Sequence, residues 1–251
     1  MAMQEKSIFE ELAPYAKMVV VPGVTVGNLT YSNQQDLYST SVFTSGATGI
    51  VAANTTVQFF VGAQGEQAAQ QGYTGGVLSL SQTNSTFSKG QAPANQVYIA
   101  THAGFLLSQI SSTNLTASPT ESLLQMSTLA AAAANKSDVF SVGQNFSWDL
   151  TIGRGITRTI GLLSEYTLSQ AYSVTDEGPT AGLALASISG QNGSPDVGIT
   201  KLQVPIVFPP LVNVTLTATN GSPFILLNTG AATNVQIKMV LRGYLMTMPV
   251  G

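Results

Sequence analysis

Apolar and polar side chains alternate near the C-terminal end of the sequence, and this pattern limits the fold more than any other feature. The apolar positions are Val235, Ile237, Met239 and Leu241, and the residues between them are Gln236, Lys238, Val240 and Arg242. A period of two places the two sets on opposite faces of a β-strand. The segment therefore predicts a strand of an antiparallel sheet that buries one face.

Similar short segments recur along the chain, separated by turns rich in Gly, Pro, Asn and Ser. About sixteen short strands are predicted in all, and fifteen of them have defined ranges: residues 19–21, 24–31, 37–44, 55–62, 77–80, 97–110, 139–142, 146–152, 155–163, 166–174, 182–187, 199–208, 212–219, 224–227 and 235–245. Gly104 indicates a bulge in the longest of them. Residues 121–134 predict the internal helix, after a start signal at Ser118-Pro119 and with five consecutive alanines. This number of strands fits all-β sandwiches or a pair of jelly rolls, with strands on both sides of the helix.

Charged residues make up only 8% of the 251 residues, whereas about 25% is usual. A free monomer so poor in charge is prone to association, so we expect the chain to be surrounded by neighbouring copies. No run of basic residues is present, which argues against direct binding of nucleic acid. The chain also lacks cysteine, a long apolar run and a recognisable signal peptide. These features predict synthesis in a cytoplasm.

Residues able to carry out chemistry are few. His102 is the only histidine, and its alternation with Val97, Ile99 and Thr101 places it in mid-strand, so we expect a structural role. Asp149 follows Trp148 in a predicted strand, and Asp176-Glu177 lies in a turn, where a structural calcium ion is an alternative that no loop motif supports. Gly153-Arg154-Gly155 lacks the lysine and the helix of a phosphate loop. We therefore expect no catalytic residue, no cofactor, no metal and no enzymatic activity.

One stretch carries a resemblance to a known family. Thr83-Asn84 is followed by a turn with Gly90, Gln91 and Pro93, and then by the strand that begins at Val97. At the other end of the chain, Leu202, Pro205, Ile206, Phe208 and Val214 form a strand pair, and residues 240–245 form a final strand just before Pro249. This arrangement resembles the double jelly-roll major capsid proteins of tailless, lipid-containing icosahedral bacteriophages of the corticovirus and finnlakevirus kind. The resemblance covers both ends of the chain and is weak over residues 112–200.

The resemblance implies a double jelly roll of two eight-stranded antiparallel sandwiches, with an arm at 1–17 and rolls at 18–135 and 136–251. A single elaborated jelly roll is the alternative, because 251 residues leave little room for loops. It further implies a viral structural protein that forms homotrimers, which then build the icosahedral shell of a virion. The implied partners are other copies of the chain, minor capsid proteins and an internal lipid membrane.

A short helix is predicted at residues 4–12, where Ile8, Phe9 and Leu12 share one face. Pro14 separates it from the first strand. A helix of this length gains order only on a surface, and its few basic residues favour a neighbouring subunit over lipid. The competing functional hypothesis is a secreted or surface β-sandwich module for carbohydrate binding or adhesion, which the loops rich in Asn, Thr and Gly favour.

Overall fold

The computed structural model describes residues 31–46, 48–80, 82–110, 141–153, 155, 157–166, 172–175, 187–190, 199–226 and 234–247. The strands are β1 (Tyr31–Thr44), β2 (Ile50–Val51), β3 (Thr56–Phe59), β4 (Gln96–Ile110), β5 (Phe146–Ile152), β6 (Arg158–Leu162), β7 (Tyr172–Thr175), β8 (Ser187–Gly190), β9 (Thr200–Phe208), β10 (Val214–Asn220), β11 (Phe224–Ile225) and β12 (Asn234–Thr247). Two short 3-10 helices, η2 (Ala68–Gln71) and η4 (Leu163–Tyr166), accompany them, and residues 141–145 are helical. The all-β expectation is confirmed for these ranges.

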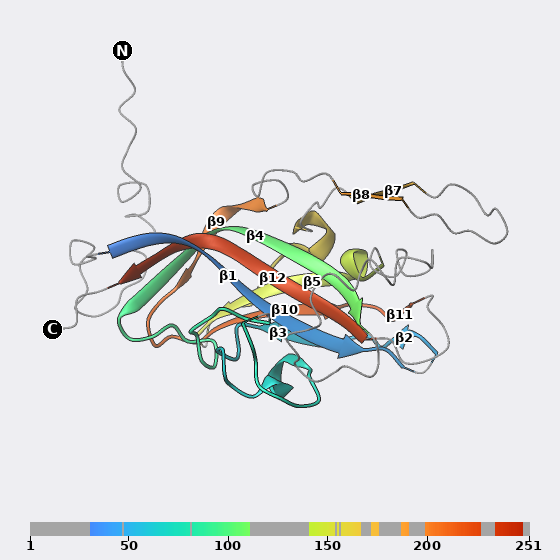
Figure 1. Cartoon of the computed structure of the whole chain (residues 1–251), viewed down its shortest axis with the longest axis horizontal. Helices are drawn as coiled ribbons and strands as arrows, with labels where there is room; N and C mark the ends of the chain where they lie inside the picture. Colours follow the sequence, from blue (N-terminus) through green and yellow to red (C-terminus); the bar gives the residue numbers. More distant parts are fainter. Residues whose placement is uncertain are drawn as a thin grey trace, which may run out of the picture.

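Eight of these strands form two four-stranded antiparallel sheets that lie one behind the other (Figure 1). We call the sheet with the order β1-β12-β4-β9 sheet I and the sheet with the order β3-β10-β5-β6 sheet II. Sheet I contains the three longest strands, β1, β4 and β12, of 14, 15 and 14 residues. Each pairs with its neighbour over almost its whole length, which satisfies most of the backbone groups in the three strands.

The strand order is that of a jelly roll. Counted along the chain without the two-stranded ribbons β2–β11 and β7–β8, the orders are 1-8-3-6 in sheet I and 2-7-4-5 in sheet II. The eight strands therefore form one sandwich, in agreement with the alternative of a single elaborated roll. The predicted division near residue 135 does not fit, because sheet I combines β1 and β4 from before it with β12 and β9 from after it. Alternation identified the buried face of the strand at 235–245 but not the strands with which it pairs.

The interior of the sandwich is filled by aromatic side chains from both sheets. Trp148 on β5 is fully buried and lies edge-on to Phe105 on β4, with ring centroids 5.5 Å apart, and to Tyr166, at 5.2 Å. Tyr98, Phe87 and Phe208 form a second aromatic group within the same core. Burying each large apolar side chain contributes about 1.5–3 kcal/mol. The space between the sheets is thus packed core.

The connection from β3 to β4 is long and folds back against sheet I. Ala68, Tyr73 and Leu78 of this connection form a small separate cluster with Val42, which lies on the outer face of β1. The segment 77–80, predicted as a strand, contains only an isolated bridge between Gln67 and Val77. The predicted strand at 139–142 is also wrong at its second half, because residues 141 and 142 are helical.

Several expectations concern residues outside the described ranges. These are the N-terminal arm with Ile8, Phe9 and Leu12, the internal helix at 121–134, and the turn carboxylates Asp176 and Glu177. They stay predictions.

Candidate functional site

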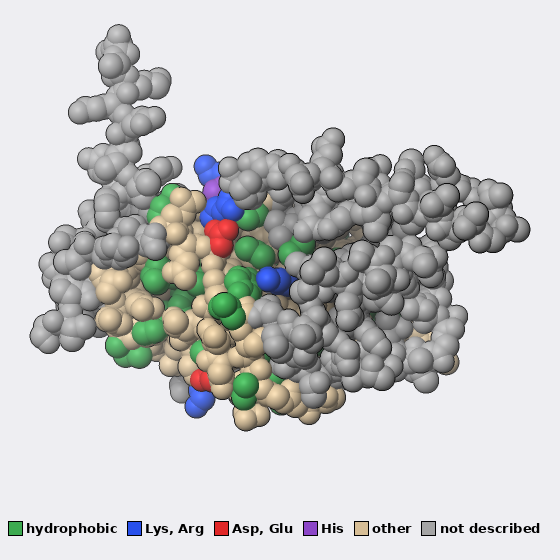
Figure 2. Space-filling view, viewed as in Figure 1, with side chains coloured by type: hydrophobic (Ala, Val, Ile, Leu, Met, Phe, Trp, Pro, Cys, Tyr) green, Lys and Arg blue, Asp and Glu red, His purple; other side chains and the backbone are tan. Residues whose placement is uncertain are grey.

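The charged side chains on the outer face of sheet I gather around an ion pair (Figure 2). Asp36 of β1 and Arg242 of β12 are directly opposite in the strand register. Arg242 donates from Nε to Oδ1 at 3.0 Å and from a terminal nitrogen to Oδ2 at 3.1 Å. This two-bond geometry is the strong form of the interaction. Because the Asp36 side chain is 41% exposed, solvent limits the contribution of the pair to about 1 kcal/mol or less.

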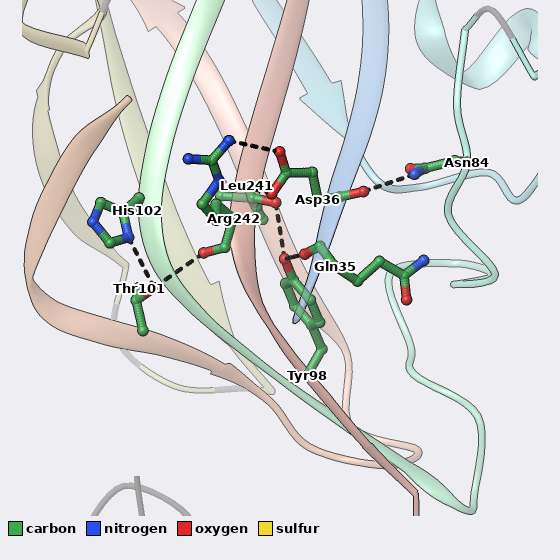
Figure 3. Close-up of polar contacts among 8 residues, drawn as sticks. All are labelled: Gln35, Asp36, Asn84, Tyr98, Thr101, His102, Leu241 and Arg242. Atoms are coloured by element: carbon green, nitrogen blue, oxygen red, sulfur yellow. Dashed lines mark hydrogen bonds and ion pairs between the residues drawn. The ribbon is translucent and has the colours of Figure 1, made fainter. Parts of the chain in front are cut away.

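His102 lies beside this pair, at a bulge in β4 (Figure 3). The register of β12 with β4 shifts between Arg242 and Gly243, which leaves Thr101 as the extra residue of β4. The Thr101 hydroxyl lies 2.9 Å from Nδ1 of His102 and donates to the Arg242 carbonyl oxygen at 3.3 Å. The expected mid-strand position of His102 is confirmed, whereas the bulge predicted at Gly104 is wrong, because Gly104 pairs regularly with Val240.

One serine, Ser108, follows His102 on β4 and lies six residues farther along the strand, which corresponds to about 20 Å. A general base must lie within hydrogen-bond reach of its nucleophile. The strand therefore does not place Ser108 beside His102.

Tyr98 fixes the same part of sheet I from its inner side (Figure 3). Its ring is fully buried, and its hydroxyl lies 2.8 Å from the carbonyl oxygens of both Gln35 and Leu241. Burial raises the pKa of Tyr98 far above its ordinary value, and the Asp36 carboxylate raises it further. The phenol thus keeps its proton and bridges β1 and β12 as a hydrogen-bond donor beneath the ion pair.

The free edge of β1 is occupied by a side chain instead of a strand. Asn84 accepts a hydrogen bond from the Tyr38 backbone N–H at 2.8 Å and donates to the Asp36 carbonyl oxygen at 2.7 Å (Figure 3). Thr83 adds a bond from its hydroxyl to the Tyr38 carbonyl oxygen at 3.0 Å. These contacts reproduce what a neighbouring strand would supply. An exposed edge is a template for unwanted pairing, so Thr83-Asn84 protects this stretch of β1.

The rest of the Gly-Gln-x-Pro motif fixes the loop between β9 and β10. The Gly90 carbonyl oxygen accepts from the Val214 N–H at 2.9 Å, and Gln91 forms a bridge with Asn213. Gly90 has φ of 72°, and a Cβ there would lie 2.6 Å from the Val214 carbonyl oxygen, so glycine is required. The motif residues on which the family resemblance depends therefore have structural roles in this chain.

Lys238 extends the charged group along β12. Its Nζ lies 3.9 Å from the centre of the Tyr38 ring, within the range of a cation–π contact. Burial lowers the pKa of Lys238 and raises the pKa of Tyr38. The ring covers the ammonium group where water is partly excluded.

The outer face of sheet II has a different chemistry, dominated by hydroxyl groups in register. Thr215, Thr217 and Thr219 of β10 face Thr151, Asp149 and Ser147 of β5, respectively. Two hydroxyl pairs extend the rows, namely Thr56 with Thr219 at 3.0 Å and Thr151 with Thr157 at 2.7 Å. Asp149 lies in β5 as predicted, and its buried Oδ1 has no hydrogen-bond partner among the described residues.

Sequence reasoning missed two features of these surfaces. Asn84 was singled out only as part of the family resemblance, but the strand edge that it occupies depends on contacts 46 to 48 residues away. The pairing of Asp36 with Arg242 spans 206 residues, and nothing local to either residue indicates it. In the described part of the chain, no group of three or more His, Asp or Glu residues is arranged to hold a metal ion.

Within the same described ranges, no helix combines the length and the apolar character needed to cross a membrane. No family model, no curated protein and no solved structure matches this chain, so its fold and surfaces are the grounds for inferring its function.

Proposed function

We propose that the chain is a structural subunit of a viral shell. The observation that carries the proposal is the jelly-roll order of the eight strands around an interior filled by aromatic side chains. Capsid proteins, lectin domains and cupins are the main users of this architecture. An interior occupied by Trp148, Phe105 and their neighbours favours a building block over a protein that binds a ligand between its sheets.

The surface supports association with copies of the same chain. At one end of the sandwich, Ile50 and Ile225 are paired across the β2–β11 ribbon and are 46% and 56% exposed. At the opposite end, Ile152 and Leu211 are 41% and 64% exposed. Exposed apolar residues at both ends of a chain with 8% charged residues favour contacts that remove them from water.

The proposed unit is a homotrimer that assembles into the icosahedral shell of a virion after synthesis in the host cytoplasm. Closed symmetric assemblies of identical chains are the usual way to bury such surfaces. Minor capsid proteins and an internal membrane are further proposed partners, and no direct contact with nucleic acid is proposed. The subunit is proposed to have no enzymatic activity.

Sedimentation velocity and electron microscopy of the purified native chain test the proposal. We expect a species of about 78 kDa, three times the 26.1 kDa chain, or closed shells. A well-behaved monomer at tens of micromolar would contradict the proposal, because a subunit with this surface must associate at such concentrations.

A second function is favoured by one specific observation, the hydroxyl rows on sheet II. In-register Thr and Ser side chains, with the partly exposed Asp149 carboxylate among them, offer hydrogen bonds to a polar chain such as a polysaccharide. On this alternative the protein is a carbohydrate-binding or adhesion module. It predicts binding to a glycan array by a stable monomer, and loss of that binding in Asp149→Ala and Thr217→Val.

A further inference from the structure

Three apolar side chains on the outer face of sheet I are buried, although they point away from the sandwich core. Val97 and Ile99 flank Tyr98 on β4, and Tyr98 points inward, so their side chains point outward. Met246 of β12 is directly opposite Val97 and shares its face. Their exposed fractions are 5%, 0% and 1%. They belong to neither the sandwich core nor the small cluster around Val42.

Val97, Ile99 and Met246 lie at the corner of sheet I where the chain enters β1 and leaves β12. Ser32, at the start of β1, pairs with Met246, and Thr247 ends β12 next to it. Residues 1–30 therefore lead directly into this corner of sheet I, and residues 248–251 lead out of it. Residues 1–30 are long enough to cross all three strands, because an extended chain spans about 3.3 Å per residue.

The N-terminal stretch also has the required composition. Residues 18–26 read Met-Val-Val-Val-Pro-Gly-Val-Thr-Val, and Gly27-Asn28 follows them just before β1. Gly and Asn are favoured in turns. A turn at Gly27-Asn28, in place of the continuous strand expected at 24–31, would direct the apolar run back over sheet I. Apolar cover is what Val97, Ile99 and Met246 need, because burying apolar surface is the main favourable term in packing.

We propose that residues 18–26 of the same chain lie across the outer face of sheet I and cover Val97, Ile99 and Met246. The segment thereby joins the folded unit, and only the residues before it are left to reach a neighbouring subunit. The proposal concerns the isolated chain and does not depend on the proposed shell function.

Disulfide trapping tests it cleanly, because the chain contains no cysteine. Tyr244 lies on the same face, directly opposite Ile99. Tyr244→Cys is combined with Val21→Cys or with Val24→Cys, and the protein is oxidised with diamide at low concentration. The matched control combines Val24→Cys with Thr217→Cys, on the outer face of sheet II. Since packed sheets lie about 10 Å apart and these side chains point in opposite directions, the control sulfurs lie beyond disulfide range.

We expect an intramolecular disulfide in most molecules of at least one Tyr244→Cys pair and in few molecules of the control. Equal trapping in both, or none with Tyr244→Cys in either pair, overturns the proposal. Trapping that yields only covalent dimers also overturns it, because the cover then comes from a second copy.

A second measurement uses deletions and the fluorescence of a dye that binds exposed apolar surface. Deleting residues 1–26 should raise the dye signal several-fold relative to the full chain, whereas deleting 248–251 should leave it unchanged. The reverse result overturns the proposal. If the longer deletion prevents folding, the disulfide pairs decide the question alone.

Discussion

Replacing Gly243 by alanine tests the bulge that fits β4 against β12. A Cβ at Gly243 would lie 2.0 Å from the Ile99 carbonyl oxygen and 2.8 Å from Ala100 Cα, whereas ordinary contact begins at 3.4 Å. The obstacle is backbone on both counts, so no side-chain rotation relieves it. The two strands would have to separate by more than an ångström at the centre of sheet I.

The cost of that separation follows from two contributions. Overpacking in a tight region costs about 1–3 kcal/mol, and each weakened ladder hydrogen bond costs about 0.5–1.5 kcal/mol. With two such bonds affected, we expect Gly243→Ala to lower the free energy of unfolding by about 2–6 kcal/mol. For a chain of this size the melting temperature should fall by roughly 4–24 °C.

The measurement is thermal and urea unfolding followed by circular dichroism. Gly221→Ala is the matched control, because a Cβ at Gly221 meets no atom within 4 Å and the change should stay within about 0.5 kcal/mol. If Gly243→Ala is as stable as the control, the close approach of β4 and β12 at the bulge is not real and the argument fails.

Three further outcomes are expected. Asn84→Ala should lower the free energy of unfolding by about 1–2 kcal/mol, because the edge of β1 loses both hydrogen bonds to the Asn84 side chain. Urea denaturation measures this change, and an unchanged midpoint would contradict the role of Asn84. The folded-state pKa of Tyr98 is raised, so its contribution to stability is complete below pH 10 and is lost as the pH rises above the ordinary phenol value of about 10. Between pH 9 and pH 11, roughly the window set by that phenol value, the free energy of unfolding of Tyr98→Phe should therefore fall less than that of the native chain, as measured by urea titration. The lowered pKa of Lys238 affects both proteins alike. An equal dependence of the free energy of unfolding on pH in the two proteins would refute the role given to Tyr98. Finally, Ile225→Glu should weaken assembly in sedimentation experiments without changing the melting temperature. The control Gln58→Glu should change neither the assembly nor the melting temperature. If Ile225→Glu assembles as strongly as the native chain, the β2–β11 ribbon is not one of the contacts.

Local pattern predicted the long strands well. The segments predicted at 97–110, 199–208 and 235–245 appear as β4, β9 and β12 with ends shifted by no more than two residues. Period-two alternation is a local property, and β12 buries one face in the way that alternation implies. In β4, by contrast, residues 97–100 are buried on both faces. The same reasoning failed at residues 77–80, because Leu78 pairs with the backbone of the loop at Gly65 and Glu66 and the Leu80 carbonyl oxygen accepts from the Tyr38 hydroxyl.

The number of sandwiches could not be derived from the same signals. Splitting the chain near residue 135 assumed that strands pair with close neighbours in sequence, which is only the commoner case. The register of β1 with β12 instead joins the two ends of the described chain. The roles of Asp36 and Asn84 follow from that register, so neither role could be predicted from the sequence before the topology was known.

The side-by-side position of β1 and β12 has a consequence for the time at which the protein can fold. Tyr31 pairs with Thr247, which is synthesised 216 residues later. At a synthesis rate of about 5–20 residues per second, this delay is on the order of 10–40 s. During this delay β1 lacks its partner strand β12, and the facing sheet II is also incomplete until β10 has been made. Strand pairing between such distant segments forms slowly. Sheet I can be completed only after Thr247 has been synthesised, so a nascent chain that stops short of β12 cannot present the finished surface of this sheet to other copies.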